Sequence, residues 1–150
     1  MKTMPWVIAI VSTSLAAVTV AAPPPAPSAA DKAAIFKAAG FKANGNQFTR
    51  CPEDTTPSHV PGSIEMEDLN ADGTAEAWVK ESSGFCYGNT AEAFVLLTKD
   101  AKGAWRIILD QVGIALARTT KHKGWPDIEV GGPGMGPFPV FRYDGTKYKL

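Results

Sequence analysis

Apolar and polar residues alternate in several short runs after residue 62, which is the pattern of strands that bury one face. In SIEMED (residues 63–68), Ile64 and Met66 fall on one face and the neighbouring glutamates fall on the other. Three further runs rich in apolar residues are also typical of strands, namely AEAWVKE (75–81), AEAFVLLTK (91–99) and AWRIILD (104–110). We therefore expect one hairpin around residues 68–75 and a second one that turns at residues 100–103.

The rest of the chain continues the strand pattern less regularly. Weaker strands are indicated around Ile114, Leu116 and Thr119 and at DIEV (127–130). The C-terminal PVFRYDGTKYKL (139–150) is typical of a hairpin. Its turn is expected at Asp144-Gly145, a dipeptide that accepts the positive φ angles of a type I′ turn. The patterns predict six to eight short strands in all.

One helix is predicted before these strands, in DKAAIFKAAGF (31–41). Asp31 is a good N-cap, and Gly40 stands where a helix would end in a left-handed residue. The segment 48–62 holds three prolines and predicts an irregular loop. Together these patterns predict the α+β class, with the N-terminal helix packed on an antiparallel, hairpin-built sheet. The shape would be a small sandwich or a half-open barrel, and the strand order is left open.

The first thirty residues predict export from the cytoplasm. Lys2 gives a positive end, an apolar stretch follows at residues 6–22, and small residues come after it, as in a signal peptide over residues 1–22. Serines and threonines interrupt the apolar stretch, so a membrane anchor is the weaker alternative. A Pro/Ala linker at residues 23–30 leads into a single globular domain at residues 31–150. We expect a periplasmic or secreted protein with no stable membrane insertion after cleavage.

Composition and charge restrict the function further. The chain has 150 residues, 45% hydrophobic and 20% charged, which suits one compact domain. Lys plus Arg and Asp plus Glu are 15 each, so no net field favours nucleic acid or an anionic membrane surface. The two histidines, His59 and His122, belong to no common catalytic or zinc motif. We therefore expect a non-catalytic protein that does not bind nucleic acid.

The chain has two cysteines, Cys51 and Cys86. In an oxidising compartment, a single pair most simply forms a disulfide. Closing this loop would stabilise the fold by about 4 kcal/mol in the chain-entropy description. A metal pair or a catalytic thiol are the alternatives, and the local sequences RCPED and GFCYGN contain no histidine to support either.

The stretch EDLNADGTAE (67–76) carries oxygen-bearing side chains in the order D-x-N-x-D-G-x-x-E. Calcium takes about six to eight hard oxygens, and this alternation places several of them inside one tight loop. The predicted calcium ligands are the side chains of Asp68, Asn70 and Asp72, the backbone carbonyl of Thr74, and Glu76 directly or through water. Val79 stands where an EF-hand would need its bidentate glutamate. The alternative is a turn whose side chains cap their own backbone without an ion.

The segment IEMEDLNADGTAEAWVKE resembles the D-x-[DN]-x-[DN]-G-x-x-[DE] hairpins of FG-GAP and VCBS-type repeats, found in integrins and bacterial surface proteins. That resemblance implies a structural calcium ion between two antiparallel strands, held by the five residues named above. Those proteins carry several copies and form propellers, whereas this chain holds one copy. The layout over residues 31–150 also resembles a set of uncharacterised small exported bacterial proteins, and this second resemblance carries no activity.

The stretch SSGFCYGNT contains an S-G-x-x-Y pattern that runs from Ser83 to Tyr87. It resembles a motif of bacterial periplasmic lysozyme inhibitors. The resemblance implies that Ser83 and Tyr87 would contact the catalytic carboxylates of a target enzyme. The alternative is a turn that Cys86 ties inward through the disulfide.

Residues 131–139 are so rich in glycine and proline that they cannot continue a strand. One interpretation is a rigid loop that displays Met135 and Phe138 to a protein partner, with Trp125 at the rim. The other is a crossover packed on the domain's own core, with Trp125 buried. We predict an exported, non-catalytic binding domain with a calcium hairpin and one disulfide. The alternatives are a periplasmic inhibitor or immunity protein against a cell-wall-degrading enzyme, and a small hydrolase with an unrecognised site.

Overall fold

The structure is a computed structural model that describes residues 24–132, 134 and 136–150. The predicted signal peptide and Met135 lie outside the described residues. In the described part of the chain, no helix is long and apolar enough to cross a membrane.

Three helical segments and ten strands occur among the described residues. The helical segments are α1 (Ala29–Ala38), α2 (Gly84–Tyr87) and the 3₁₀ turn η1 (Gly88–Thr90). The strands are β1 (Lys42–Asn44), β2 (Gln47–Thr49), β3 (Val60–Glu67), β4 (Glu76–Ser82), β5 (Glu92–Lys99), β6 (Trp105–Val112), β7 (Ile114–His122), β8 (Trp125–Gly131), β9 (Val140–Tyr143) and β10 (Tyr148–Lys149). The prediction of six to eight strands is too low, mainly because β1 and β2 are too short to show alternation.

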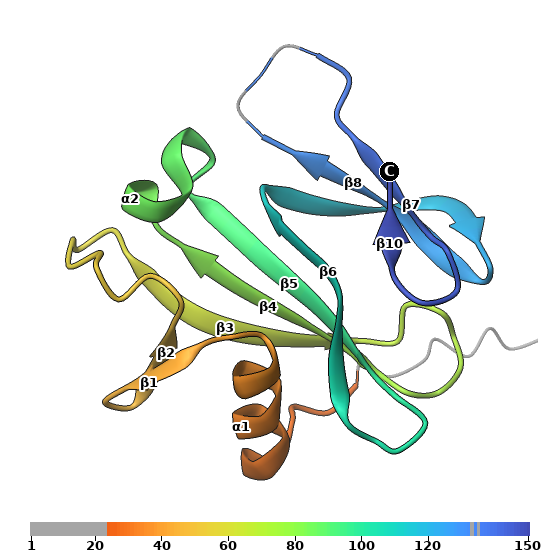
Figure 1. Ribbon diagram of the computed structural model, residues 1–150, viewed down its shortest axis with the longest axis horizontal. Coiled ribbons are helices and arrows are strands. Elements are labelled where there is room, and N and C mark those ends of the chain that lie inside the picture. Colours follow the sequence, from red (N-terminus) through yellow and green to blue (C-terminus); the bar gives the residue numbers. More distant parts are fainter. Residues whose placement is uncertain (1–23, 133, 135) are drawn as a thin grey trace, which may run out of the picture.

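All strand pairs are antiparallel, and they form two four-stranded sheets beside the β1–β2 hairpin. The first sheet has the order β3-β4-β5-β6 and the second has the order β10-β9-β8-β7 (Figure 1). Within each sheet, every strand therefore pairs with its neighbours in sequence, and the sheets do not close into a barrel. The expectation of a sheet-rich, antiparallel chain built from hairpins is confirmed.

The chain passes from the first sheet to the second at Gly113, which stands alone between β6 and β7. Its φ angle is 143°. A Cβ at this position would lie 2.5 Å from Cγ1 of Val130 and 2.6 Å from the carbonyl oxygen of Gly131. Because a side chain has no room there, glycine fixes the corner at which the two sheets meet.

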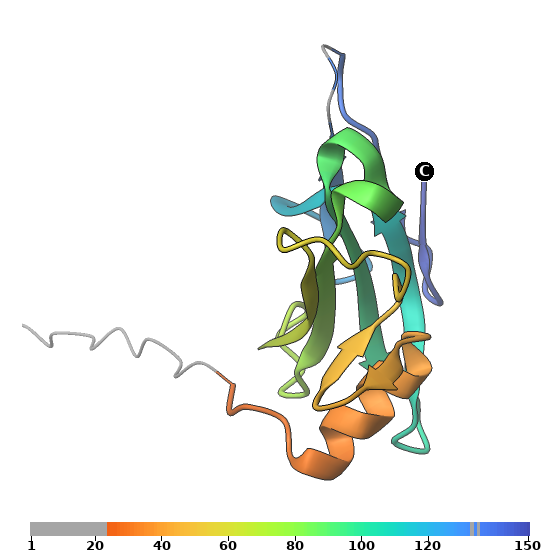
Figure 2. The ribbon, with the colours of Figure 1, turned by 90° about the vertical axis from the view of Figure 1, so that its left-hand side faces the viewer.

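Buried side chains form two clusters. The first cluster joins the two sheets and contains Leu69, Trp78, Phe94, Leu96, Ile108, Leu109, Trp125, Ile128, Val130, Phe141, Tyr143 and Tyr148. The second contains Ile35, Phe36 and Ala39 of the N-terminal segment with Phe41, Ala77, Val79, Val95 and Leu97. Alternate residues of β4 and β5 thus belong to different clusters, so both faces of these strands are buried. Figure 2 shows α1 and α2 near opposite ends of the first sheet.

The helix α1 begins earlier than predicted. Its N-cap is Ser28, whose hydroxyl accepts a hydrogen bond from the N–H of Asp31. Asp31 lies in the first helical turn, where its carboxylate accepts from the indole N–H of Trp105 at 3.2 Å. The predicted end is confirmed, because Gly40 has a φ of 80° and α1 stops just before it.

The three predicted hairpins are present, at residues 68–75, 100–104 and 144–147. The type I′ turn predicted for Asp144-Gly145 is wrong. Gly145 has a φ of 108°, whereas Asp144 is not among the residues with positive φ. The carboxylate of Asp144 instead accepts hydrogen bonds from the N–H groups of Thr146 and Lys147, which supports a longer loop.

Candidate functional site

The acidic turn between β3 and β4 brings three of its predicted ligands together. The carboxylate of Asp68 accepts hydrogen bonds from the N–H of Asp72 at 3.1 Å and of Gly73 at 2.9 Å. The side-chain oxygen of Asn70 accepts from the same N–H of Asp72 at 3.0 Å. Asp72 in turn accepts from the N–H of Thr74 at 2.7 Å. The side chains therefore shape the turn by capping its backbone.

Glu76 is more deeply buried than the other predicted ligands. It is the first residue of β4 and is fully buried. One carboxylate oxygen accepts from the N–H of Leu69 at 3.0 Å and the other from the hydroxyl of Thr98 at 3.0 Å. Burial raises the pKa of Glu76 to about 7, and the nearby charges of Asp72 and Asp68 act in the same direction.

The turn fits a calcium ion in the chemistry of its donors. Asp68, Asn70 and Asp72 supply hard oxygens, and each carboxylate oxygen keeps a lone pair beyond the one used in the hydrogen bonds of the turn. Glu76 already accepts from the N–H of Leu69, within the turn, and from the hydroxyl of Thr98, and it would join an ion directly or through water.

A different trio of metal-ligand side chains lies close together. Among the described residues, Cys51, Glu53 and Cys86 are the one group of three whose ligand atoms lie within 4.8 Å of one another. Both cysteines are joined in a disulfide. They therefore have no thiolate to offer, and this trio is not a metal site.

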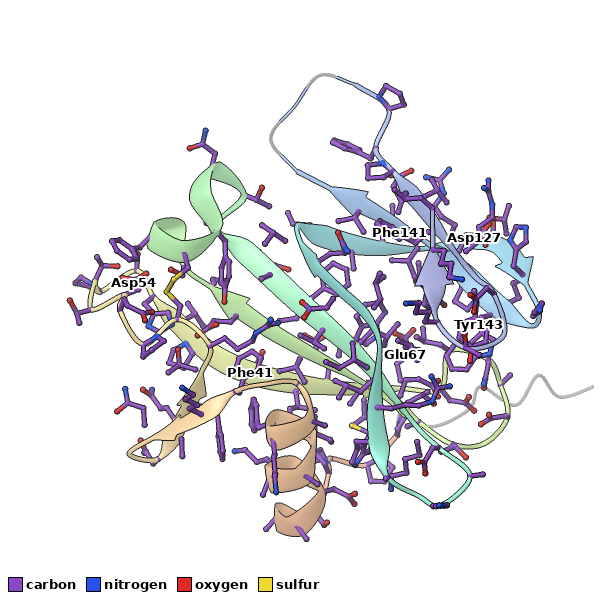
Figure 3. All side chains as sticks on the ribbon, in the orientation of Figure 1. Phe41, Asp54, Glu67, Asp127, Phe141 and Tyr143 are labelled. Carbon is purple, nitrogen blue, oxygen red and sulfur yellow. A yellow bond between two sulfur atoms is a disulfide. The ribbon has the colours of Figure 1, made fainter. Side chains whose placement is uncertain are left out.

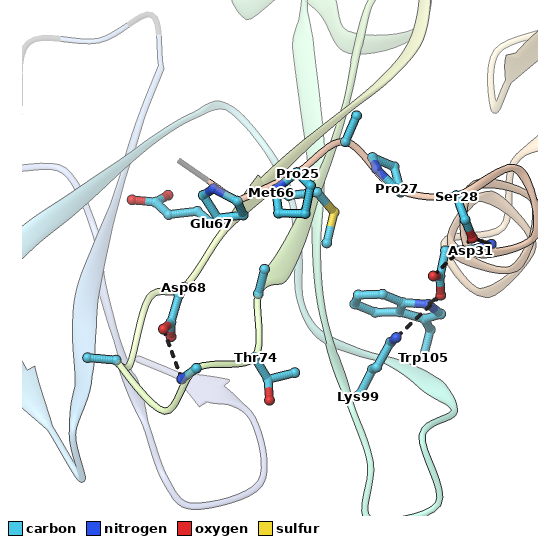
Figure 4. A pocket seen from close by; sticks show the side chains of 15 residues that line it. Pro25, Pro27, Ser28, Asp31, Met66, Glu67, Asp68, Thr74, Lys99 and Trp105 are labelled. Atoms are coloured by element: carbon cyan, nitrogen blue, oxygen red, sulfur yellow. Dashed lines mark hydrogen bonds and ion pairs between the residues drawn. The ribbon is translucent and has the colours of Figure 1, made fainter. Parts of the chain in front are cut away.

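A hollow of about 900 Å³ lies beside the acidic turn (Figure 4). Its wall includes the proline-rich residues 24–28, together with Met66, Asp68, Lys99 and Trp105. The indole ring of Trp105 is already covered on one side, because the ammonium of Lys99 lies 4.9 Å from its centre. No cluster of catalytic side chains faces this hollow among the described residues that line it.

The predicted disulfide is present and joins Cys51 to Cys86, with 6.2 Å between their Cα atoms. Ser83 lies directly behind it. This serine caps α2 by accepting from the N–H of Cys86, and its hydroxyl donates to Asp54 at 2.7 Å. Figure 3 shows Asp54 beside the disulfide. Ser83 is fully buried, so it has no surface to offer to an enzyme cleft.

Tyr87 is likewise engaged inside the protein. Its hydroxyl donates to the carboxylate of Glu81 at 2.5 Å. Burial, followed by the contact with Glu81, raises the pKa of Tyr87 well above its usual range. Phe85 of this loop, in contrast, is 70% exposed. The S-G-x-x-Y pattern therefore serves the disulfide-pinned turn, which was the alternative interpretation of this stretch.

Glu81 is the centre of a buried polar cluster that sequence reasoning missed. Five groups donate to its carboxylate, namely the Thr49 hydroxyl, the N–H groups of Arg50 and Cys51, the His59 ring and the Tyr87 hydroxyl. Burial alone would raise the pKa of Glu81, but the hydrogen bonds led by Thr49 outweigh it and hold the pKa below its ordinary value. Alternation in β4 was the available signal, because Glu81 shares the face of buried Val79.

A polar hollow of about 310 Å³ adjoins this cluster. Its lining includes Thr49, Asp54, Thr56 and His59. His59 therefore stands between the hollow and the buried carboxylate of Glu81, with 3.0 Å between its Nε2 and Oε1 of the glutamate. An acid that orients a histidine beside a cavity is an arrangement found in hydrolases.

The candidate partner-binding residues of the second sheet divide into buried and exposed ones. Trp125 is buried and stacks on Tyr143, with 4.5 Å between the ring centres. It belongs to the core and not to a rim. Phe138 is 40% exposed and borders a hollow of about 290 Å³ formed with Val112 and Val130. The segment that carries Phe138 joins the neighbouring strands β8 and β9, so it is a hairpin connection and not a crossover (Figure 1).

The second histidine also has an acidic partner. Nδ1 of His122 lies 2.6 Å from the carboxylate of Asp127, which also accepts from the hydroxyl of Thr120 at 2.7 Å. Asp127 is buried, and burial alone would raise its pKa; the hydrogen bonds from Thr120 and His122 outweigh this and lower the pKa. The His122 side chain is 48% exposed. Its partner Asp127 and Asp54, which lines the same hollow as His59, lie on opposite sides of the molecule in Figure 3.

Comparisons with protein-family models, with curated proteins and with solved structures found no match to this chain.

Proposed function

We propose that this chain is an exported, non-catalytic binding domain that contacts its partner through the uncovered face of the second sheet. The register of the strands defines this outer face. Leu116 is opposite Glu129, Glu129 is opposite Val140, and Arg142 is opposite Lys149. Residues opposite one another share a face of a sheet. The outer face therefore consists of Ile114, Leu116, Glu129, Val140, Arg142 and Lys149.

The observation that carries the proposal is the exposure of aliphatic side chains on this face. Ile114 is 55% exposed and Leu116 is 54% exposed. Val112 at 54% and Phe138 at 40% continue the apolar surface toward the β8–β9 connection. Exposed apolar side chains that gather on one surface are typical of a contact site.

The rest of the molecule supplies a rigid frame in this proposal. The helix α1 packs on the far side of the first sheet, which the shared burial of Ile35, Phe36 and Val79 supports. The disulfide holds the loop before β3 against α2. A calcium ion at the acidic turn would stiffen the β3–β4 hairpin, and the oxygens of Asp68, Asn70 and Asp72 support that role. The disulfide is also in keeping with export.

Partner capture with matched surface variants tests the binding function. Leu116→Ser removes an aliphatic side chain from the outer face, and Val60→Ser removes one of similar exposure (55%) from the first sheet. The purified protein, immobilised and exposed to an extract of the cell envelope, is expected to retain a partner that the Leu116→Ser variant loses and the Val60→Ser variant keeps. Equal capture by all three proteins would contradict the use of this face.

The position of His59 favours a small hydrolase as the second candidate. His59 borders the 310 Å³ hollow and is oriented by buried Glu81. If this pair were catalytic, His59→Gln would abolish hydrolysis of simple esters or peptides and leave the fold intact. A screen of ester, phosphoester and peptide substrates with both proteins decides the matter, since activity that survives in the variant excludes His59.

A further inference from the structure

The charges of this neutral chain are unevenly distributed. Residues 51–98 contain nine acidic side chains and one basic one, a difference of eight negative charges. Residues 114–150, which form the second sheet, contain six basic and three acidic side chains, a difference of three positive charges. The balanced total therefore hides a cationic second sheet, and the surface potential has to be judged sheet by sheet.

The acidic groups of the second sheet are all engaged within it. Glu129 pairs with Arg118 at 3.0 Å, and Asp144 pairs with Lys149 at 2.7 Å. Asp127 is buried, with its side chain 4% exposed. The cations are more exposed than these acids, with side-chain exposures of 48% for Arg118, 55% for Arg142 and 60% for Lys149. Arg142 also lies 4.0 Å from Asp127, so each of these three cations has an acidic partner. The excess of three positive charges belongs to Lys121, Lys123 and Lys147, which are all exposed, and the second sheet as a whole therefore presents positive charge to an approaching partner.

Aliphatic and cationic side chains lie next to one another on the outer face. Ile114 and Leu116 precede Arg118 on β7, and Val140 precedes Arg142 on β9. The salt bridge between Arg118 and Glu129 places the guanidinium beside Leu116, because Glu129 is opposite Leu116. A surface that mixes basic and aliphatic side chains complements the interface of an anionic bilayer. There the cations meet phosphate groups and the aliphatic chains enter the headgroup region.

We infer that the outer face of the second sheet docks on an anionic phospholipid surface. This inference rests on the binding function proposed above and names the partner of the same face. The contact is peripheral, because a flat sheet face offers no spanning segment. A soluble polyanion or an acidic protein would use Arg142 and Lys149 in the same way, but charge alone would give no role to exposed Ile114 and Leu116.

Vesicle co-sedimentation at low ionic strength tests the inference with the purified protein. Vesicles with equal parts of phosphatidylglycerol and phosphatidylcholine are expected to pellet the protein, whereas pure phosphatidylcholine vesicles are not. The double variant Arg142→Gln/Lys149→Gln is expected to bind roughly 10- to 30-fold more weakly, since each basic residue near an anionic surface contributes about 1 kcal/mol. The control Lys32→Gln/Lys42→Gln removes the same charge from exposed residues outside the second sheet and is expected to bind normally.

Aliphatic contact is tested separately with Leu116→Ser and its matched control Val60→Ser. A loss of vesicle binding in the first variant alone supports insertion of the aliphatic side chains into the interface. Equal binding to neutral and anionic vesicles, or equal loss in the two charge variants, would overturn the inference. Pelleting without vesicles would also overturn it, in favour of contacts between copies. Partner capture through Leu116 without vesicle binding would reject the lipid and leave the proposed function standing.

Discussion

The strand β4 carries a buried glutamate near each end, and the two differ in what surrounds them. Glu76 is 0% exposed and Glu81 is 1% exposed. Two donors reach Glu76 among the described residues, one from Leu69 and one from Thr98. Five donors reach Glu81, from Thr49 at the end of β2, from the loop before β3 and from Tyr87. The pKa accordingly rises to about 7 at Glu76 and falls below its ordinary value at Glu81.

The difference shows that burial alone does not determine the pKa of a carboxylate. Desolvation is the largest influence at both sites and acts in the same direction. What differs is the supply of hydrogen-bond donors, together with the neighbouring charges of Asp68 and Asp72 at Glu76. At the Glu81 end, hydrogen-bond donors of the protein itself satisfy the carboxylate, and this cluster acts as a structural anchor. The Glu76 end carries an excess of negative charge that a cation would offset.

Glu81→Gln is expected to have the largest effect. The amide would direct N–H groups at donors such as the N–H of Arg50, and the cluster would lose its buried charge. Removal of one partner from a buried, charged network costs about 3–5 kcal/mol. Urea unfolding followed by circular dichroism measures the loss. The matched control is Glu65→Gln, on the exposed face of β3, and a similar small effect of both variants would contradict the anchoring role.

Removal of the disulfide comes next in size and should act at the same end. Cys51→Ser/Cys86→Ser opens a loop with a sequence separation of 35 residues. The free energy of unfolding is expected to fall by about 4 kcal/mol, mainly because the unfolded chain gains conformational entropy. Hydrogen exchange should then accelerate first at the N–H groups of Arg50 and Cys51, which donate to Glu81. Faster exchange at Leu69, beside Glu76, would show instead that the two ends of β4 are not independent.

Glu76→Gln is expected to change stability in the opposite direction from Glu81→Gln. A glutamine can accept from the N–H of Leu69 and donate to the Thr98 hydroxyl, so both contacts survive without a charge. With chelator present, the raised pKa of Glu76 implies that the native state binds its proton more tightly than the unfolded chain. The wild type should therefore lose stability, by at most about 3 kcal/mol, as the pH rises from about 4.5 to about 7.

The unfolding free energy of the wild type, measured between pH 4.5 and pH 8, checks this expected loss of stability with rising pH. The Glu76→Gln variant should not show this loss, and above pH 7 its unfolding free energy should equal or exceed that of the wild type. Glu81 acts in the opposite sense, because its lowered pKa stabilises the native state above the unfolded value and this contribution is lost on acidification. A wild type whose stability rises steadily from pH 4.5 to pH 8 would refute the description of Glu76.

The smallest effect is expected for the exposed ion pair on the same strand. Lys80 of β4 lies 2.7 Å from Glu65 of β3, with side-chain exposures of 34% and 62%. Ion pairs that are exposed to solvent contribute about 0–1 kcal/mol to the free energy of unfolding. Lys80→Ala should therefore change the unfolding free energy by less than about 1 kcal/mol, measured as for Glu81→Gln. A loss as large as that of Glu81→Gln would mean that burial is not what separates these carboxylates.

Local patterns predicted the hairpins well, because alternation and turn residues are encoded in neighbouring positions. The turn at residues 68–75 and the helix end at Gly40 are examples. The helix start was misplaced because Ser28 and Asp31 are both good N-caps, and Ser28 stands in a proline-rich stretch. The hairpin of β1 and β2 was missed because three residues are too few to show a period.

The polar cluster around Glu81 could not be predicted from local pattern in the same way. Its donors come from Thr49 and His59, which are more than twenty residues away in the sequence, and from Tyr87. Only the folded chain brings them to one carboxylate. The predicted calcium ligands show the same limit, since spacing placed Asp68, Asn70 and Asp72 in one turn but could not show that Glu76 is buried between Leu69 and Thr98.

Titration calorimetry with calcium is the most direct test of the proposal that the acidic turn beside Glu76 binds a cation, whereas the Glu81 end is neutralised by its own hydrogen-bond donors. The wild type should show one binding site with a dissociation constant of about 10⁻⁴–10⁻³ M, and calcium at tenfold that value should add about 1.4 kcal/mol to its stability. Asp72→Ala should abolish both the heat and the stabilisation. No heat and no shift of the melting temperature in the wild type would contradict the account.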